Sequence, residues 1–124
     1  MLGVLVVDNH WAICELVRIV LSERGYSVWE SMTPEAALEL FTQHVHSIHL
    51  VLLNVNLPGL TGPELLDQMR AIRPQVRCVF MSAGDLGRYT REELLAAGAE
   101  GLLEKPFTTQ RLLGAMKYPD RPSS

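Results

Sequence analysis

The sequence predicts a single α/β domain built on a doubly wound parallel sheet. Short apolar runs typical of buried strands alternate with amphipathic helical segments along the 124 residues. Five strands alternating with five helices favour a parallel sheet covered on both faces, because each crossover between parallel strands needs a helix. With 48% hydrophobic residues, the chain can bury both faces of such a sheet.

The first half of the chain predicts three strands and two helices. The strands are expected at residues 2–7, 26–30 and 50–53. One helical face recurs at i, i+3, i+4, i+7 and i+8, as Ile13, Leu16, Val17, Val20 and Leu21, and Gly25 ends that helix. Residues 33–35, Thr-Pro-Glu, supply an N-cap, a first-turn proline and an acid for a helix that reaches about Phe41.

The second half begins two of its helices with capping boxes. Residues 61–64 (Thr-Gly-Pro-Glu) start a helix to about residue 72, with Leu65, Met69 and Ile72 expected to point inward. Residues 90–93 (Thr-Arg-Glu-Glu) start a helix that ends near Gly98. The remaining elements are two strands and a last helix, expected at 76–81, 101–103 and 108–116. We expect one domain over residues 1–117 and a loose tail at 118–124, which holds two prolines and two serines.

Composition excludes several classes of protein. The net charge of -3, without a basic block, argues against a nucleic-acid-binding module. No apolar run approaches the length of a membrane span, and no signal peptide precedes the first strand, so we expect a cytoplasmic protein. Cys14 and Cys78 are not at metal or redox spacing, and both are expected to be small apolar core residues of a reduced protein.

Polar side chains stand at the carboxyl ends of four expected strands. Asp8 and Asn9 follow the first, Asn54 the third, Ser82 the fourth and Lys105 the fifth. Ligands of doubly wound sheets bind beyond the carboxyl ends of the strands. We therefore expect residues scattered over most of the chain to converge on one pocket.

These four strand ends resemble the receiver domain of bacterial two-component response regulators, the CheY-like family. The resemblance implies a flavodoxin-like fold with strand order 2-1-3-4-5. It also implies that a kinase histidine passes a phosphoryl group to an aspartate of the receiver, with a divalent cation offsetting the charge. A cis peptide bond is expected between Lys105 and Pro106 on the same ground.

Three residues match the family's site. Asp8 matches the first member of its acidic pair, Ser82 its switch hydroxyl and Lys105 its lysine. The magnesium positions that the resemblance implies are Asp8, Asn9, Asn54 and Asn56.

Three positions depart from the family. Asn54 stands where the phosphate-accepting aspartate is expected, Asn9 replaces the second acid, and Leu102 replaces the aromatic residue that swings inward on activation. A neutral amide is a poor nucleophile, so we expect no acyl phosphate on Asn54. Three carboxylates and a lysine would carry a charge of about -2, whereas Asp8 and Lys105 sum to about zero. We therefore expect weak magnesium binding or none, and no other cofactor.

A structural interpretation of the same residues stays open. Asn9 can serve as the N-cap of the first helix, a position that favours asparagine. Ser82 and Lys105 can persist for structural reasons, with Lys105 paired to Asp8.

Two functions follow from these residues. The first is a pseudo-receiver, not an enzyme, that binds a histidine kinase, a phosphotransfer protein or an output protein without being phosphorylated. The second is a conventional magnesium-dependent receiver in which Asn54 replaces the acceptor aspartate by engineering, or in which Asp8 or Ser82 accepts the phosphoryl group. A sensor of small ligands that uses the neutral pocket is a remoter interpretation.

Other residues indicate partner surfaces or invite a metal-site interpretation. Trp11 begins the first helix, where receivers dock their partners; it either stays exposed as an anchor or folds back over the neighbouring loop. The last strand and helix border a possible homodimer surface, although core packing explains most of their apolar residues: Leu102, Leu112, Leu113 and Met116. The spacing of His44, His46 and His49 suggests a metal, but a solvated loop is the preferred interpretation because no acid or cysteine joins them.

Overall fold

The protein forms one five-stranded parallel sheet with the order β2-β1-β3-β4-β5. The structure is a computed structural model that describes residues 2–117, so the tail expected at 118–124 lies outside the described residues. The strands are β1 (Gly3–Val7), β2 (Ser27–Ser31), β3 (Leu50–Asn54), β4 (Arg77–Ser82) and β5 (Leu102–Glu104). Both the doubly wound class and the strand order expected from the resemblance are confirmed.

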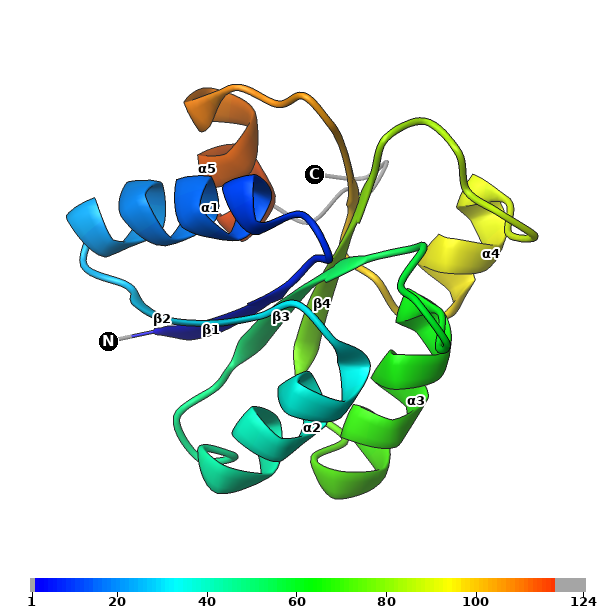
Figure 1. Cartoon of the computed structure of the whole chain (residues 1–124), viewed down its shortest axis with the longest axis horizontal. Coiled ribbons are helices and arrows are strands. Elements are labelled where there is room, and N and C mark those ends of the chain that lie inside the picture. The colour runs from blue at the N-terminus through cyan, green and yellow to red at the C-terminus, as the bar shows by residue number, and fades with distance from the viewer. Residues whose placement is uncertain (1, 118–124) are drawn as a thin grey trace.

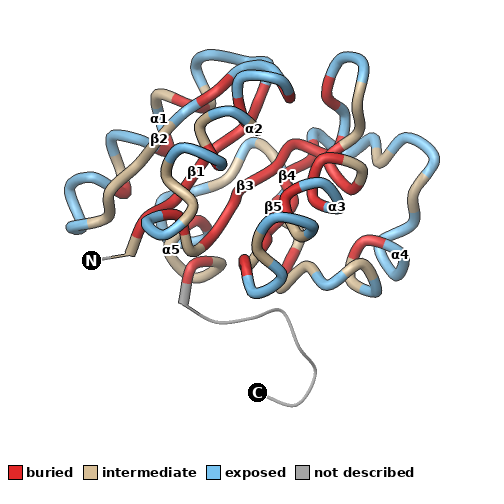
Figure 2. The backbone as a smooth tube through the Cα atoms, turned by 90° about the horizontal axis from the view of Figure 1, so that it is seen from below, coloured by how far each residue is buried: buried red, intermediate tan, exposed pale blue. Residues whose placement is uncertain are grey.

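Within residues 2–117, five helices cover the two faces of the sheet (Figure 1). They are α1 (Trp11–Glu23), α2 (Pro34–Gln43), α3 (Gly62–Ile72), α4 (Arg91–Ala96) and α5 (Thr109–Lys117). One face packs against α1 and α5, and the other against α2, α3 and α4. The apolar runs seen in the sequence are the central strands: every residue of β1 and β3 is buried (Figure 2).

Local capping signals define where the helices begin. The Thr33 side chain accepts a hydrogen bond from the Ala36 N–H. Thr61 and Thr90 each form a complete capping box, with Glu64 and Glu93 respectively. These three predicted helix starts are confirmed. The expected strand at 26–30 lies one residue later, because the Tyr26 N–H donates to Leu21 O and so belongs to the turn after α1.

Two residues expected to point inward are exposed. Ile72 is the last residue of α3 and is exposed. In that last turn of the helix, Met69 is the residue buried against the core. On α1 the buried positions are Cys14, Val17 and Leu21, so Leu16 lies on the flank of the helix. Helical periodicity finds the apolar face but does not show where the covered part of it ends.

The histidine cluster is largely structural. The His44 ring stacks on Trp29 with the ring centroids 4.9 Å apart. His49 Nδ1 accepts a hydrogen bond from the Gly3 N–H at 3.2 Å. A solvated loop therefore describes only His46, and that part of the prediction was wrong for the other two. Within residues 2–117, no three His, Cys, Asp or Glu side chains are grouped so that they could hold a metal ion.

Both cysteines are buried, as expected. In the described part of the chain, none of the helices combines the length and the apolar character that crossing a membrane requires.

Candidate functional site

The carboxyl edge of the sheet gathers the predicted polar residues. Asp8 follows β1, Asn54 ends β3, Ser82 ends β4 and Lys105 follows β5. Asp8, Asn54 and Ser82 are buried, and only 9% of the Lys105 side chain is exposed. The Lys105 N–H donates to Ser82 O at 2.7 Å, which joins the ends of the last two strands. The Lys105–Pro106 peptide bond is cis, as expected.

Asp8 is engaged through both carboxylate oxygens. Lys105 Nζ lies 2.7 Å from Oδ2. The His10 backbone N–H donates to Oδ1 at 2.9 Å, and His10 Nδ1 lies 3.0 Å from the same oxygen. A buried carboxylate needs this compensation, because an unpaired charge in the interior is strongly unfavourable. The predicted pairing of Lys105 with Asp8 is confirmed.

Asn54 uses its side-chain amide within the protein. Its Nδ2 donates to Asn9 Oδ1 and to Asn56 O, at 3.0 Å in each case. The expectation that Asn9 caps α1 is wrong, since the N-cap position is His10 and its side chain makes no capping bond. The carboxamide oxygen of Asn9 instead faces Asn54, because a neutral donor stands there.

The start of α3 supports the position of Asn54. The Gly62 N–H donates to Val55 O at 2.9 Å. A Cβ at Gly62 would come within 2.6 Å of Asn54 O, so only glycine lets the helix begin this close to the end of β3. Gly62 is therefore a packing residue here.

Ser82 is committed to the loop that follows β4. Its hydroxyl donates to Asp85 O at 3.2 Å and accepts from the Gly84 N–H at 3.0 Å. Asn56 Nδ2 donates to the same Asp85 carbonyl at 2.7 Å. Asn56 and Ser82 therefore hold this loop against the site with neutral hydrogen bonds.

A second set of contacts, which sequence reasoning missed, ties the end of this loop to α3. Tyr89 Oη and Thr61 Oγ1 lie 2.8 Å apart, and Arg88 Nη2 lies 3.1 Å from Glu64 Oε2. The hydrogen bond from the Thr61 N–H, followed by the bonds from Arg88 and the Thr61 hydroxyl, lowers the pKa of Glu64. The capping box signalled Thr61 and Glu64, but no local pattern points to partners in another loop.

The remaining predicted positions lie outside this network. Leu102 pairs with Phe80 across β4 and β5 and packs against the core under α4. Leu112 and Met116 are buried in the core beneath α1 and α5, so core packing does explain them. Trp11 is 65% exposed, which favours the alternative in which its side chain stays exposed.

The parallel sheet, its strand order and the lysine–aspartate pair at its carboxyl edge together define a doubly wound signalling domain of receiver type. The family model of the response regulator receiver domain matches residues 4–117. The chain therefore belongs to the response regulator receiver domain family.

Relatives show the same domain alone and within larger proteins. Sporulation initiation phosphotransferase F of Bacillus subtilis is 30% identical over 115 residues, which cover 92% of this chain and 90% of that protein. Response regulator MprA of Mycobacterium sp. (strain KMS) is 34% identical over 92% of this chain, and the match spans 48% of the length of MprA. Sensor kinase CckA of Brucella abortus is 31% identical over 78% of this chain, but the match spans only 10% of that kinase.

Solved structures agree with the fold. The receiver domain of NtrX from Brucella abortus superposes with a TM-score of 0.81 at 30% identity, covering 92% of this chain and 94% of that one. A response regulator receiver domain protein from Clostridium thermocellum gives a TM-score of 0.84 at 26% identity, covering 94% and 91%.

Proposed function

We propose that this chain is a receiver domain that accepts no phosphoryl group and acts by binding protein partners. The observation that carries the proposal is Asn54 at the end of β3, whose amide nitrogen donates hydrogen bonds to Asn9 and Asn56. Formation of an acyl phosphate needs a carboxylate oxygen as nucleophile. The amide nitrogen is conjugated and already donates two hydrogen bonds, and the amide oxygen is neutral.

The other two candidate acceptors are equally engaged. Asp8 is fully buried, with one oxygen against Lys105 and the other against His10. The Ser82 hydroxyl donates its proton to Asp85 O. For either residue to attack a phosphoryl donor, it would first have to break contacts that hold the site together.

The residues present do not fit the family's magnesium ion. Mg²⁺ favours anionic oxygen ligands in near-octahedral geometry. Here the single carboxylate, Asp8, is neutralised by Lys105, and the Asn9 carboxamide oxygen already accepts from Asn54. Weak magnesium binding or none is therefore part of the proposal, and no phosphoryl-transfer step is assigned to the domain.

Protein partners are the remaining function for such a domain. The chain resembles segments of a sensor kinase and of a response regulator that are both longer than itself. We therefore propose a histidine kinase, a phosphotransfer protein or an output protein as the partner, met in the cytoplasm. We propose no enzymatic activity for this chain.

The test is incubation with acetyl phosphate and Mg²⁺ followed by intact mass. The mass of the wild-type chain should stay unchanged. A variant with both Asn9→Asp and Asn54→Asp provides the matched control, since it restores the two carboxylates on the same fold. A gain of one phosphoryl group by the wild type would reject the proposal.

A further inference from the structure

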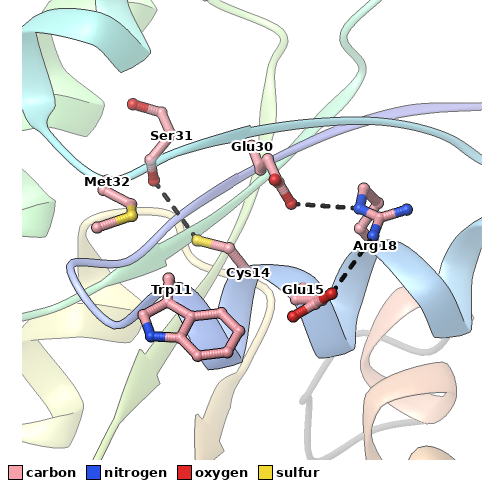
Figure 3. A pocket seen from close by; sticks show the side chains of 7 residues that line it. All are labelled: Trp11, Cys14, Glu15, Arg18, Glu30, Ser31 and Met32. Atoms are coloured by element: carbon pink, nitrogen blue, oxygen red, sulfur yellow. Dashed lines mark hydrogen bonds and ion pairs between the residues drawn. The ribbon is translucent and has the colours of Figure 1, made fainter.

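A groove separate from the strand-end site opens between α1 and the connection from β2 to α2 (Figure 3). Its volume is about 390 Å³, within the range that accommodates ligands or anchoring side chains. The lining residues come from two segments and are Trp11, Cys14, Glu15, Arg18, Glu30, Ser31 and Met32. The buried Cys14 lines the groove, and its thiol donates to Ser31 O at 3.6 Å.

The mouth of the groove is apolar. Trp11 is 65% exposed and Met32 is 45% exposed, the highest values among the large hydrophobic residues of the described chain. Both belong to the lining, so they form one patch rather than scattered surface residues. Trp is a common energetic anchor of protein interfaces, and Met adapts to irregular partner surfaces.

The far end of the groove carries an unbalanced charge. Arg18 lies between two carboxylates, with Nη2 at 3.9 Å from Glu15 and Nε at 3.6 Å from Glu30. One guanidinium faces two carboxylates, which leaves one negative charge in excess. Figure 3 shows both contacts converging on Arg18, away from the indole of Trp11.

Neither of these contacts is a formed hydrogen bond. N–H···O bonds to carboxylates are about 2.7 to 2.9 Å long. Elsewhere in the same protein, Arg77 does form such a pair, with Nε and Nη2 at 2.8 and 2.7 Å from the two oxygens of Glu100. Glu15 and Glu30 are each about half exposed and loosely held. They can therefore turn to another cation with little loss.

We propose that this groove receives a cationic side chain of a protein partner, an arginine or lysine carried next to an apolar residue. The inference rests on the proposed function and names the chemistry of the partner. A cation over the face of the Trp11 indole gains a cation–π interaction. The carboxylate nearest to it along the chain is that of Glu15, one helical turn after Trp11 on α1. The neighbouring apolar side chain covers Met32. An acidic segment would be repelled, and a purely apolar one would desolvate the carboxylates without pairing them.

The experiment uses two short acetylated and amidated helical peptides with the same leucine stripe. One carries arginine at the flanking positions, and the other carries glutamate there. Each is titrated into the ¹⁵N-labelled chain, with the indole N–H of Trp11 as the reporter and that of Trp29 as the internal reference. The arginine peptide should shift the Trp11 signal and the backbone amides of α1 and residues 30–32, and the glutamate peptide should not.

Variants locate the binding in the groove. Trp11→Ala should weaken the arginine peptide about tenfold, as removal of an interface anchor does. The Glu15→Gln, Glu30→Gln double variant should weaken it similarly and remove its salt dependence. Ile72→Ala and Glu92→Gln are the matched controls, since they remove an exposed apolar residue from α3 and an exposed carboxylate from α4. Both controls should leave the affinity within about twofold.

Several outcomes would overturn the inference. These are equal binding of the two peptides, no Trp11 shift at millimolar arginine peptide, or controls that weaken binding as much as the groove variants. Saturation by N-acetyl-arginine amide with the affinity of the peptide would also overturn it, because the groove would then be a small-cation site. If the arginine peptide does not bind and the mass of the chain stays unchanged after acetyl phosphate, only the inference about the groove is rejected. If the arginine peptide binds and the wild-type chain gains a phosphoryl group, only the proposed function is rejected.

Discussion

Lys105 Nζ lies 2.7 Å from Asp8 Oδ2, an ion pair that joins residues 97 positions apart in the chain. The carboxylate is fully buried and the lysine is nearly so. Each charge therefore depends on the other for its compensation. This pair joins the ends of β1 and β5 at the carboxyl edge of the sheet.

Lys105→Met should destabilise the fold by about 3 kcal/mol, because it leaves a buried carboxylate without its cation. Urea denaturation measures the loss. The Asp8→Asn, Lys105→Met double variant should recover part of it, since no charge is then buried unpaired. Arg111→Met, which removes an exposed cation from α5, serves as the control. Equal stability of the single and double variants would contradict the pairing argument.

Restoring the acceptor alone should restore little phosphorylation. In Asn54→Asp, Asn9 remains neutral, so magnesium binding stays weak and labelling by acetyl phosphate should be slow. Adding Asn9→Asp supplies the second carboxylate, and labelling followed by intact mass should rise. If Asn54→Asp alone labels as fast as the double variant, Asn9 is harmless and a substituted conventional receiver becomes the better account.

The same double variant should become dependent on magnesium for its stability. Its two new carboxylates, at positions 9 and 54, crowd that of Asp8, so the variant should unfold at a lower temperature than the wild type in EDTA. Saturating Mg²⁺ should reverse this, by about 2.7 kcal/mol at a hundred times the Kd. The wild type should show neither a thermal shift nor a saturable change of Trp11 or Trp29 fluorescence at submillimolar Mg²⁺. Such a change would contradict the neutral-site account.

Glu64 should contribute stability that is lost in acid. Its pKa is held below the ordinary value of 4.5, chiefly by the hydrogen bond from the Thr61 N–H and then by Arg88. A lowered pKa in the folded state stabilises the fold above pH 4.5, and this contribution disappears as the pH falls through the folded-state pKa. The difference in urea stability between wild type and Glu64→Gln should therefore shrink on going from neutral pH to below pH 4.5. Glu39→Gln on α2 controls for removal of an exposed carboxylate; a constant difference for Glu64→Gln would refute this role.

Neither cysteine should react while the protein is folded. Burial, followed by the nearby charge of Asp8, raises the pKa of Cys14 to about 11, and burial raises that of Cys78 further. The thiolate is the reactive form, so alkylation by iodoacetamide at pH 8 should be slow for both. Intact mass should show two additions only in denaturant. Rapid single labelling of the native chain would show that Cys14 is reached through the groove.

Local sequence signals predicted the parts of this fold that depend on neighbouring residues. The capping threonines Thr61 and Thr90 mark helix starts because their partners lie three residues away. Alternation of strands and helices predicted the parallel sheet, but the order of its strands came from the family resemblance. Ile72 was misplaced because periodicity does not show where the sheet ends.

The members of the site and its Lys105–Asp8 pair were predictable from the sequence, but the other hydrogen bonds of the site were not. Strand ends place Asp8, Asn54, Ser82 and Lys105 at one edge, since parallel strands end on the same side. The bonds from Asn54 to Asn9 and from Asn56 to Asp85 depend on side-chain directions across separate loops. The Tyr89–Thr61 contact likewise links residues 28 apart, with no repeating pattern between them.

The amide of Asn54 has a consequence for how information could pass through this protein. A carboxylate at this position can be phosphorylated and dephosphorylated. An amide held by Asn9 and Asn56 offers no group that a kinase could modify in this way. Under the proposed function, the domain therefore has one state, and only the number of copies can vary. Synthesis and degradation would then set the strength of the signal, and the chain would titrate its partner instead of reporting a stimulus.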